Sequence, residues 1–242
     1  MRNLLNHLII CFAVFFISCD QLQQIATDVQ NEVGSVSSEP TLSEIINGLK
    51  EALQVGTGNT VEALNQKGGY LNNPKLRIPF PPDAQRAADK LRDLGMGKLV
   101  DDFENSLNTA AENAASEAKP IFVNAIKSMT FEDAKKILNG PDNAATEYFE
   151  NRTRQSLYSS FAPKVENSLN NVNVTKHWEQ ITTTYNKIPL VEKVETDLTK
   201  YATDKALDGL FVKLEEEEQK IRENPAARVT DLLKKVFGSV NR

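Results

Sequence analysis

The fold is decided by the stretch KLVDDFENSLNTAAENAASEAKPIFVNAIKSM at residues 98–129. Its apolar residues recur at spacings of three and four, as on one face of an α-helix: Leu99, Phe103, Leu107, Ala110, Ala114, Ala118, Ile121, Ala125 and Met129. The alanines have little bulk, so neighbouring helices are expected to approach closely. Because Pro120 lacks a backbone N–H, we expect a kink or two helices nearly end to end. The stretch therefore predicts the central helix of a bundle.

Start and stop signals divide the rest of the body into further helices. Thr41 and Glu44 have the spacing of a capping box, Gly68 and Gly69 end a short helix, and Pro163 is expected to interrupt a later one. The expected helices outside the central stretch span 41–56, 57 or 59 to 66, 83–94, 130–140, 142–162, 175–187, 203–223 and 225–237. The predicted fold class is all-α, an irregular multi-helix bundle of eight or nine helices.

One segment is not helical in this interpretation. Residues 70–82, YLNNPKLRIPFPP, contain four prolines and cannot be helical throughout. Leu76, Ile78 and Phe80 alternate along it, so we expect an extended crossing whose apolar side chains pack against the helices. A short strand within the segment fits the same pattern.

Composition narrows the classes of function. The chain has 242 residues, of which 40% are hydrophobic and 25% are charged, which fits one ordinary domain plus a leader. Its net charge is -5, which gives no support for nucleic-acid binding, since that function needs a stripe of basic residues. The cysteines are Cys11 and Cys19, and His177 is the only histidine beyond the leader. We therefore expect no zinc, haem or copper site and no cofactor.

The N-terminal residues have the pattern of a secretory signal. Arg2 precedes an apolar run over residues 8–17, which is too short to span a bilayer as a helix. The residues Phe-Ile-Ser-Cys at 16–19 resemble a bacterial lipobox, so we expect Cys19 to be acylated; an ordinary cleaved signal is the alternative. The chain is then exported and lipid-anchored to a membrane, facing the periplasm. The expected layout is a lipoprotein-type signal peptide over 1–18, a lipid-anchored tether over 19–40 and a single helical domain over 41–242.

The order of the segments resembles a known family. The segments that carry the resemblance are LSEIINGLKEALQVG, GGYLNNPKLRIPFPP, LGMGKLVDDFENSLNTAAENAASEAKPIFVNAI, MTFEDAKKIL and ATDKALDGLFVKLEEEEQKIRENPAARVTDLLKKVF. They are similar to segments of domain of unknown function 4197, a family of exported bacterial proteins, and they cover nearly everything from Thr41 to Gly238. The resemblance implies an all-helical periplasmic or envelope protein of unassigned activity, and it brings no catalytic residues. The lipobox departs from the ordinary signals expected of many relatives.

Arg152 falls inside the apolar face of its expected helix. A buried guanidinium requires a carboxylate partner. Glu217 and Glu218 border the apolar stripe of the helix at 203–223, so we expect a buried or half-buried pair between Arg152 and one of them. We interpret the pair as a salt bridge that fixes helix register, with a ligand-binding role as the alternative. Glu216 and Lys220, and likewise Glu218 and Arg222, are four residues apart, a spacing that favours ion pairs within one helix.

A polar row on the central helix is a second candidate site. Asp101, Asn105, Asn108 and Glu112 share one face, which we interpret as solvated. A ligand-binding cleft, a calcium site or paired carboxylates for acid–base chemistry are the alternatives. The glutamate run at 215–218 is interpreted as a solvated, salt-bridged face and not as a metal site.

No catalytic motif accompanies these residues, since the sequence has neither a Gly-x-Ser-x-Gly elbow nor a phosphate-binding loop. The expected function is a non-enzymatic envelope module that binds a partner protein or an apolar ligand between helices. The alternative is a carboxylate-based envelope hydrolase with a cleft on the 98–129 helix. Raised carboxyl pKa values around such a cleft would indicate the enzyme, whereas a filled interior with an exposed apolar patch would indicate the interaction module.

Overall fold

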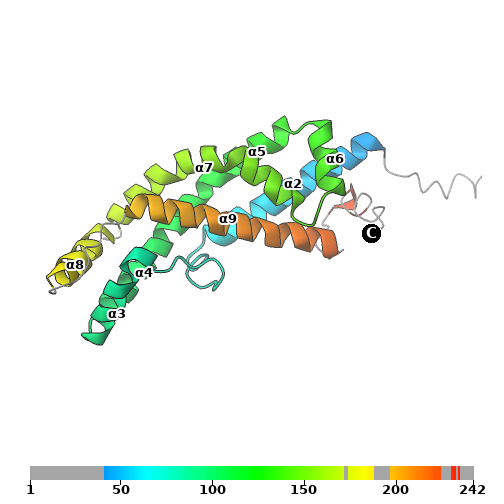
Figure 1. The fold of residues 1–242 in the computed structure, drawn as a ribbon. Coiled ribbons are helices and arrows are strands. Elements are labelled where there is room, and N and C mark those ends of the chain that lie inside the picture. Colours follow the sequence, from blue (N-terminus) through cyan, green and yellow to red (C-terminus); the bar gives the residue numbers. More distant parts are fainter. Residues whose placement is uncertain (1–40, 172–173, 188–196, 225–229, 233, 235–242) are drawn as a thin grey trace, which may run out of the picture. The chain divides into compact units, whose positions relative to one another are not determined.

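The structure, a computed structural model, describes residues 41–171, 174–187, 197–224, 230–232 and 234. Regular structure in this part of the chain is helical throughout, without a strand. The α-helices are α2 (Leu42–Leu64), α3 (Gln85–Asp93), α4 (Gly97–Ala114), α5 (Ala118–Ser128), α6 (Phe131–Asn139), α7 (Ala144–Asn171), α8 (Val174–Asn186) and α9 (Leu198–Glu223), with 3-10 turns at Pro82–Ala84 and Ala115–Glu117 (Figure 1). The predicted all-α class is confirmed.

The chain separates into two compact units, residues 1–41 and 42–242, and the helices belong to the second. The expected signal peptide, Cys19 and the tether lie outside the described residues. So does most of the helix expected over 225–237. These expectations remain predictions.

Helix α9 packs against three of the other helices. It contacts α7, α2 and α4, and α4 also contacts α7 (Figure 1). Its buried face carries Leu207, Leu210, Phe211 and Leu214, which recur at helical spacing as predicted. The helix begins five residues earlier than expected, because the side chain of Asp197 accepts a hydrogen bond from the N–H of Lys200 and caps it.

The central stretch forms α4 and α5, separated by the 3-10 turn at residues 115–117. This confirms the expected division into two helices. The turn lies just before Pro120, whose ring would clash with the carbonyl of Ser116 in a continuous α-helix. The alanines of the stretch are buried as expected: Ala110, Ala111, Ala114, Ala115 and Ala118 are each 0% exposed.

Two expected helix breaks are wrong. Helix α2 continues through Gly56, and the hydroxyls of Thr57 and Thr60 donate to carbonyls of the preceding turn at 2.7 and 2.8 Å. Gly56 is buried against α9, where a Cβ would lie 3.5 Å from Ile221. Helix α7 continues through Pro163, which is exposed, so the ring and the unpaired carbonyl face away from the core.

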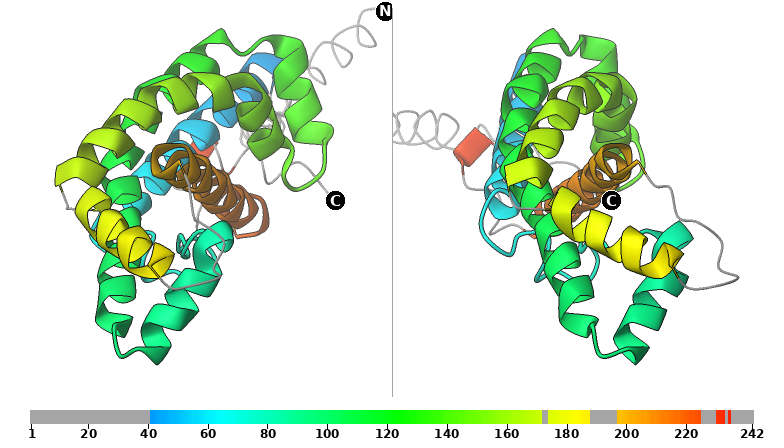
Figure 2. Two further views of the ribbon diagram at one scale, coloured as in Figure 1. Left: turned by 60° about the vertical axis from the view of Figure 1, so that its left-hand side comes forward. Right: turned by 90° about the vertical axis from the view of Figure 1, so that its left-hand side faces the viewer.

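An aromatic group joins α4, α8 and the extended segment. Phe80 and Phe103 have ring centroids 4.9 Å apart, and Trp178 stacks on Phe103 at 5.2 Å. Helices α4 and α8, which carry Phe103 and Trp178, pack against each other, and Figure 2 shows their course. The contacts bury the apolar surface that Trp178 of α8 presents to α4.

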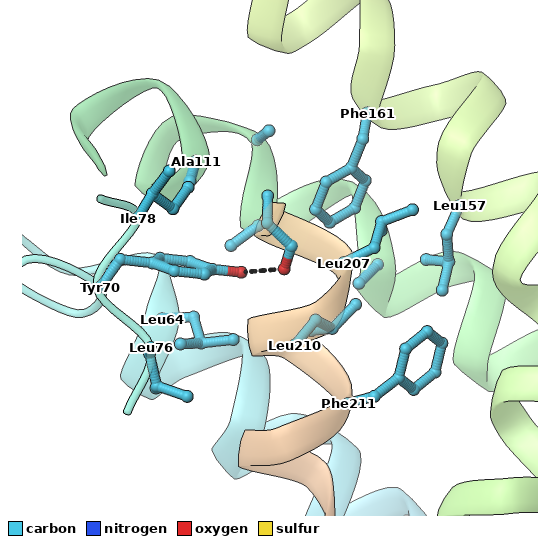
Figure 3. Packing of buried hydrophobic residues seen from close by; sticks show 14 of the residues in the cluster. Leu64, Tyr70, Leu76, Ile78, Ala111, Leu157, Phe161, Leu207, Leu210 and Phe211 are labelled. Carbon is cyan, nitrogen blue, oxygen red and sulfur yellow. Dashed lines mark hydrogen bonds between the residues drawn. The ribbon is translucent and has the colours of Figure 1, made fainter. Parts of the chain in front are cut away.

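The extended segment packs as predicted. Leu76, Ile78 and Phe80 are buried, and so is Tyr70 at its start. The Tyr70 hydroxyl donates a 2.8 Å hydrogen bond to the carbonyl of Ala206 on α9 (Figure 3). Its ring approaches α9 closely because Gly209 has no side chain; a Cβ there would lie 2.8 Å from the ring. No residue of this segment is in a strand.

Candidate functional site

The polar row expected on one face of α4 is divided by the structure. Asp101 and Asn105 are exposed, and Asp101 pairs with Arg92 of α3 at 2.7 Å. Asn108 and Glu112 are buried, at 0% and 6% exposure, so the expected solvated face is wrong for these two. The extended segment covers Asn108 and Glu112. Its backbone has no helix or sheet partners, and these two side chains supply hydrogen bonds to it instead.

Asn108 and Glu112 act as anchors for the extended segment. The Asn108 amide accepts from the N–H of Ile78 at 2.8 Å and donates to its carbonyl at 2.9 Å. A carboxylate oxygen of Glu112 accepts from the N–H groups of Tyr70 and Leu71 at 3.2 and 3.3 Å. Burial, together with the Glu112 charge, raises the pKa of the Tyr70 hydroxyl, which therefore stays protonated and donates. These contacts give Asn108 and Glu112 structural roles.

The expected buried pair of Arg152 with Glu217 or Glu218 is wrong. Arg152 is exposed, and the buried position on α7 belongs to the next residue, Thr153, between Phe149 and Leu157. One residue along a helix turns the side chain by about 100°. That rotation is enough to move Arg152 out of the core.

Glu218 is buried as the sequence suggested, but its partners are different. It accepts from the N–H groups of Ala145 and Thr146 at 2.9 and 2.8 Å and from the Thr146 hydroxyl at 2.8 Å. The predicted pair with Arg222 is present at 2.7 Å. Glu218 therefore caps the first turn of α7 from a neighbouring helix, where a negative charge is favourable.

Glu217 is also buried, so the expected solvated face of the glutamate run is wrong at 217 and 218. It accepts from Lys220 at 2.6 Å and from Asn59 at 3.3 Å, and Lys213 lies 3.3 Å away. The predicted pair of Lys220 with Glu216 is therefore wrong, since Glu216 pairs with Lys213 and Lys75. Burial acts to raise the Glu217 pKa, but the hydrogen bonds and charges of Lys220 and Lys213 outweigh it and lower the pKa. The group is a charged structural link between α9 and α2.

A surface hollow lies between α6 and the start of α7. We call it the α6–α7 groove. Its volume is about 500 Å³, within the range of roughly 300–1,000 Å³ typical of ligand sites. Figure 1 shows the two helices, joined by the turn after Asn139, that form its sides. It is lined by Asp133, Lys136, Ile137, Pro141, Ala144, Glu147, Tyr148, Asn151 and Arg152.

The residues at the start of α6 fix one side of the α6–α7 groove. Thr130 and Asp133 form the capping box that starts α6, with the hydroxyl of Thr130 accepting from the N–H of Asp133 at 3.2 Å. This confirms the expected helix start. Hydrogen bonds from Thr130, aided by the charges of Arg152 and Lys136, lower the Asp133 pKa. Of the predicted site residues, only Arg152 lines this groove; Lys136 and Tyr148 were not singled out by their sequence pattern.

A smaller hollow is an apolar crevice between α2, α7 and α9. Its volume is only about 30 Å³, and its walls include Leu49, Leu53 and Ile221. Glu218 and Arg222 lie at its edge. The crevice is far below the size of a small-molecule site.

Among the residues that the structure describes, no three side chains of His, Cys, Asp or Glu gather in a way that would hold a metal ion. In the same part of the chain, no helix combines the length and apolar character needed to cross a membrane.

Comparison with known proteins gives one match. A family model described as a protein of unknown function, DUF4197, matches residues 39–238. No curated protein matches the chain, and neither does any solved structure. The geometry of the described residues is thus the basis for a functional assignment.

Proposed function

Since the chain belongs to the DUF4197 family, described as proteins of unknown function, we propose that it is a non-enzymatic binding module that recognises a partner protein through the α6–α7 groove. The observation that carries the proposal is the contrast between the two hollows. The crevice among the buried helices has about 30 Å³, whereas the surface groove has about 500 Å³. A partner that approaches from outside can use the groove without opening the core.

The state of the carboxyl groups favours binding over catalysis. In the described part, the carboxyl groups whose pKa clearly departs from its ordinary value are Asp133, Glu216 and Glu217, and each pKa is lowered. A general acid needs a raised carboxyl pKa to hold its proton near neutral pH. The hydrolase alternative also required a cleft on the 98–129 helix, and neither hollow is lined by that helix.

The two hollows favour a protein partner over an apolar ligand. An apolar ligand between helices needs a chamber, and the crevice is smaller than one such ligand. The large apolar side chains exposed in the described part are Leu42, Leu94, Phe131 and Val212, on separate elements. The support for an interaction module therefore comes from the groove and not from an apolar patch.

The proposal includes attachment to a membrane. The sequence around Cys19 resembles a lipobox, and several acyl chains on that residue would hold the module at the membrane, since each buried CH₂ contributes about 0.8 kcal/mol. The module then faces the periplasm and meets partners in the cell envelope.

Acylation predicts a defined labelling result. Cells expressing the full chain and fed an alkyne-tagged fatty acid should yield a labelled protein, and Cys19→Ser should remove the label because the acylated thiol is lost. Cys11→Ser, which changes the other cysteine, should label like the wild type. Label that persists in Cys19→Ser, or a wild type without label, would show that the chain is not anchored at Cys19.

Partner binding predicts a position-dependent crosslink. A photoreactive amino acid placed at Glu147 or Asn151, both exposed in the α6–α7 groove, should capture the same envelope protein in living cells. Glu166 is an exposed position of α7 that does not line the groove and serves as the matched control. Mass spectrometry of the adducts identifies the partner. Equal capture at all three positions, or none at the groove positions, would contradict the proposal.

A further inference from the structure

The acidic side chains of the α6–α7 groove already have hydrogen-bond donors. One carboxylate oxygen of Asp133 accepts from the N–H of Thr130 at 3.0 Å and from its hydroxyl at 2.7 Å. The Glu147 carboxylate accepts from the Asn143 amide at 3.2 Å. Both acidic groups are thus engaged with their own helices or helix starts.

The donors of the groove are not engaged. The Tyr148 hydroxyl is buried and has no hydrogen-bond partner in the described part of the chain. Within the same residues, the side chains of Arg152, Lys136 and Asn151 form no ion pair or hydrogen bond with another side chain. A buried hydroxyl without a partner costs free energy that a ligand with acceptor atoms would recover.

We propose that the α6–α7 groove binds the carboxylate of an acidic segment of the partner protein. Arg152 donates through its planar fork, which matches a carboxylate, and Tyr148 and Lys136 add further donors. The rest of the segment can pack against the apolar part of the groove, which is formed by Ile137, Pro141 and Ala144. The inference rests on the proposed binding function and specifies what the groove recognises.

The charge of the groove favours a peptide carboxylate over an anionic membrane surface. Lys136 and Arg152 are balanced by Asp133 and Glu147, and the chain as a whole carries a net charge of -5. Attraction to anionic lipid requires a cluster of several basic residues. A single carboxylate requires only one well-placed guanidinium with additional donors.

A substitution at Asp133 is expected to change the affinity in the opposite direction to the loss of a donor. The charges of Arg152 and Lys136 both act on the Asp133 carboxyl group. This group therefore lies close enough to interact with a carboxylate that these two residues bind. Its negative charge opposes a bound carboxylate. Asp133→Asn keeps an oxygen that can accept from Thr130 and removes the charge. It is therefore expected to strengthen binding, opposite in direction to the loss of a donor.

The experiment titrates the purified full chain, isotopically labelled for NMR, with the peptide Ac-Gly-Glu-Asp-Glu-Gly-NH2. The same peptide with Gln and Asn in place of its acidic residues and vesicles of phosphatidylglycerol are separate arms. The acidic peptide should produce saturable shifts of the Arg152 guanidinium and of the Tyr148 and Asn151 signals. The amide peptide and the vesicles should leave these signals unchanged.

Variants separate direct contact from a structural role. Arg152→Gln should lower the affinity for the acidic peptide about tenfold, and Tyr148→Phe should lower it about threefold. Asp133→Asn should raise it about threefold. Arg86→Gln changes an exposed arginine of α3 outside the groove and should have no effect. Thermal unfolding of each variant checks that it is folded; Arg152 is exposed, so its variant should match the wild type.

The inference is overturned if the amide peptide binds as well as the acidic one, or if Arg152→Gln behaves like Arg86→Gln. It is also overturned if only the vesicles shift the groove signals, since the ligand is then a membrane. A partner crosslinked at Glu147 without acidic-peptide binding would remove this inference and leave the proposed function standing. Peptide binding without a crosslinked partner would remove the proposed function.

Discussion

Replacing Glu218 by alanine is expected to lower the free energy of unfolding by about 3–5 kcal/mol. The Glu218 and Arg222 side chains are only 7% and 8% exposed and form an ion pair. The same carboxylate accepts from the N–H groups of Ala145 and Thr146. Alanine removes the acceptor for these buried donors and the charge that faces the guanidinium, so the first turn of α7 loses its cap.

Urea unfolding of the purified protein, followed by far-UV circular dichroism, measures the effect of Glu218→Ala. Glu223→Ala is the matched control, because Glu223 lies five residues further along α9 and is exposed. It should change the free energy of unfolding by no more than about 0.5 kcal/mol. A loss for Glu218→Ala as small as that of the control would show that the buried carboxylate contributes little to the fold.

Replacing Asn108 by leucine is expected to cost about 2–4 kcal/mol, because the N–H and carbonyl of Ile78 both lose their partner inside the protein. Leucine has the same branched shape as asparagine and a larger volume, so the change removes the hydrogen bonds without leaving a cavity. The extended segment should be loosened locally. Hydrogen exchange should therefore be faster at the amide of Ile78 and its neighbours.

The control for Asn108→Leu is Asn105→Leu, one turn earlier on α4 at an exposed position. Urea unfolding should show a change within about 0.5 kcal/mol for this variant. Hydrogen exchange of the extended segment should match the wild type. If Asn105→Leu and Asn108→Leu destabilise the chain equally, the effect does not depend on the hydrogen bonds to Ile78, and the anchoring role of Asn108 is wrong.

The binding proposals depend on which groups of the α6–α7 groove are already satisfied. Its acids accept from their own helix starts, whereas the Tyr148 hydroxyl has no partner in the described residues. Such an arrangement is suited to a ligand that brings acceptors. Arg152, which the sequence analysis placed in a structural salt bridge, instead lines the groove.

The candidate site was only partly legible in the sequence. Arg152 was predicted to be buried because it aligns with Ala145, Tyr148 and Phe149 on a helical wheel, whereas the buried face of α7 continues through Thr153, about 100° away. Glu218 was recognised as bordering the core, and its ion pair with Arg222 followed from their spacing. Its hydrogen bonds to Ala145 and Thr146 join residues more than seventy positions apart, and no local pattern encodes them.

The sequence by itself determined the helical class, the buried face of the central stretch and the non-helical course of the proline-rich segment. These features depend on the period of apolar residues and on proline geometry, which act over a few neighbouring positions. Only the tertiary structure decided that α2 and α7 continue past Gly56 and Pro163, that the extended segment covers Asn108 and Glu112, and that α6 and α7 leave a groove. Each of these outcomes depends on contacts between distant segments, whose free energy overrides local preference.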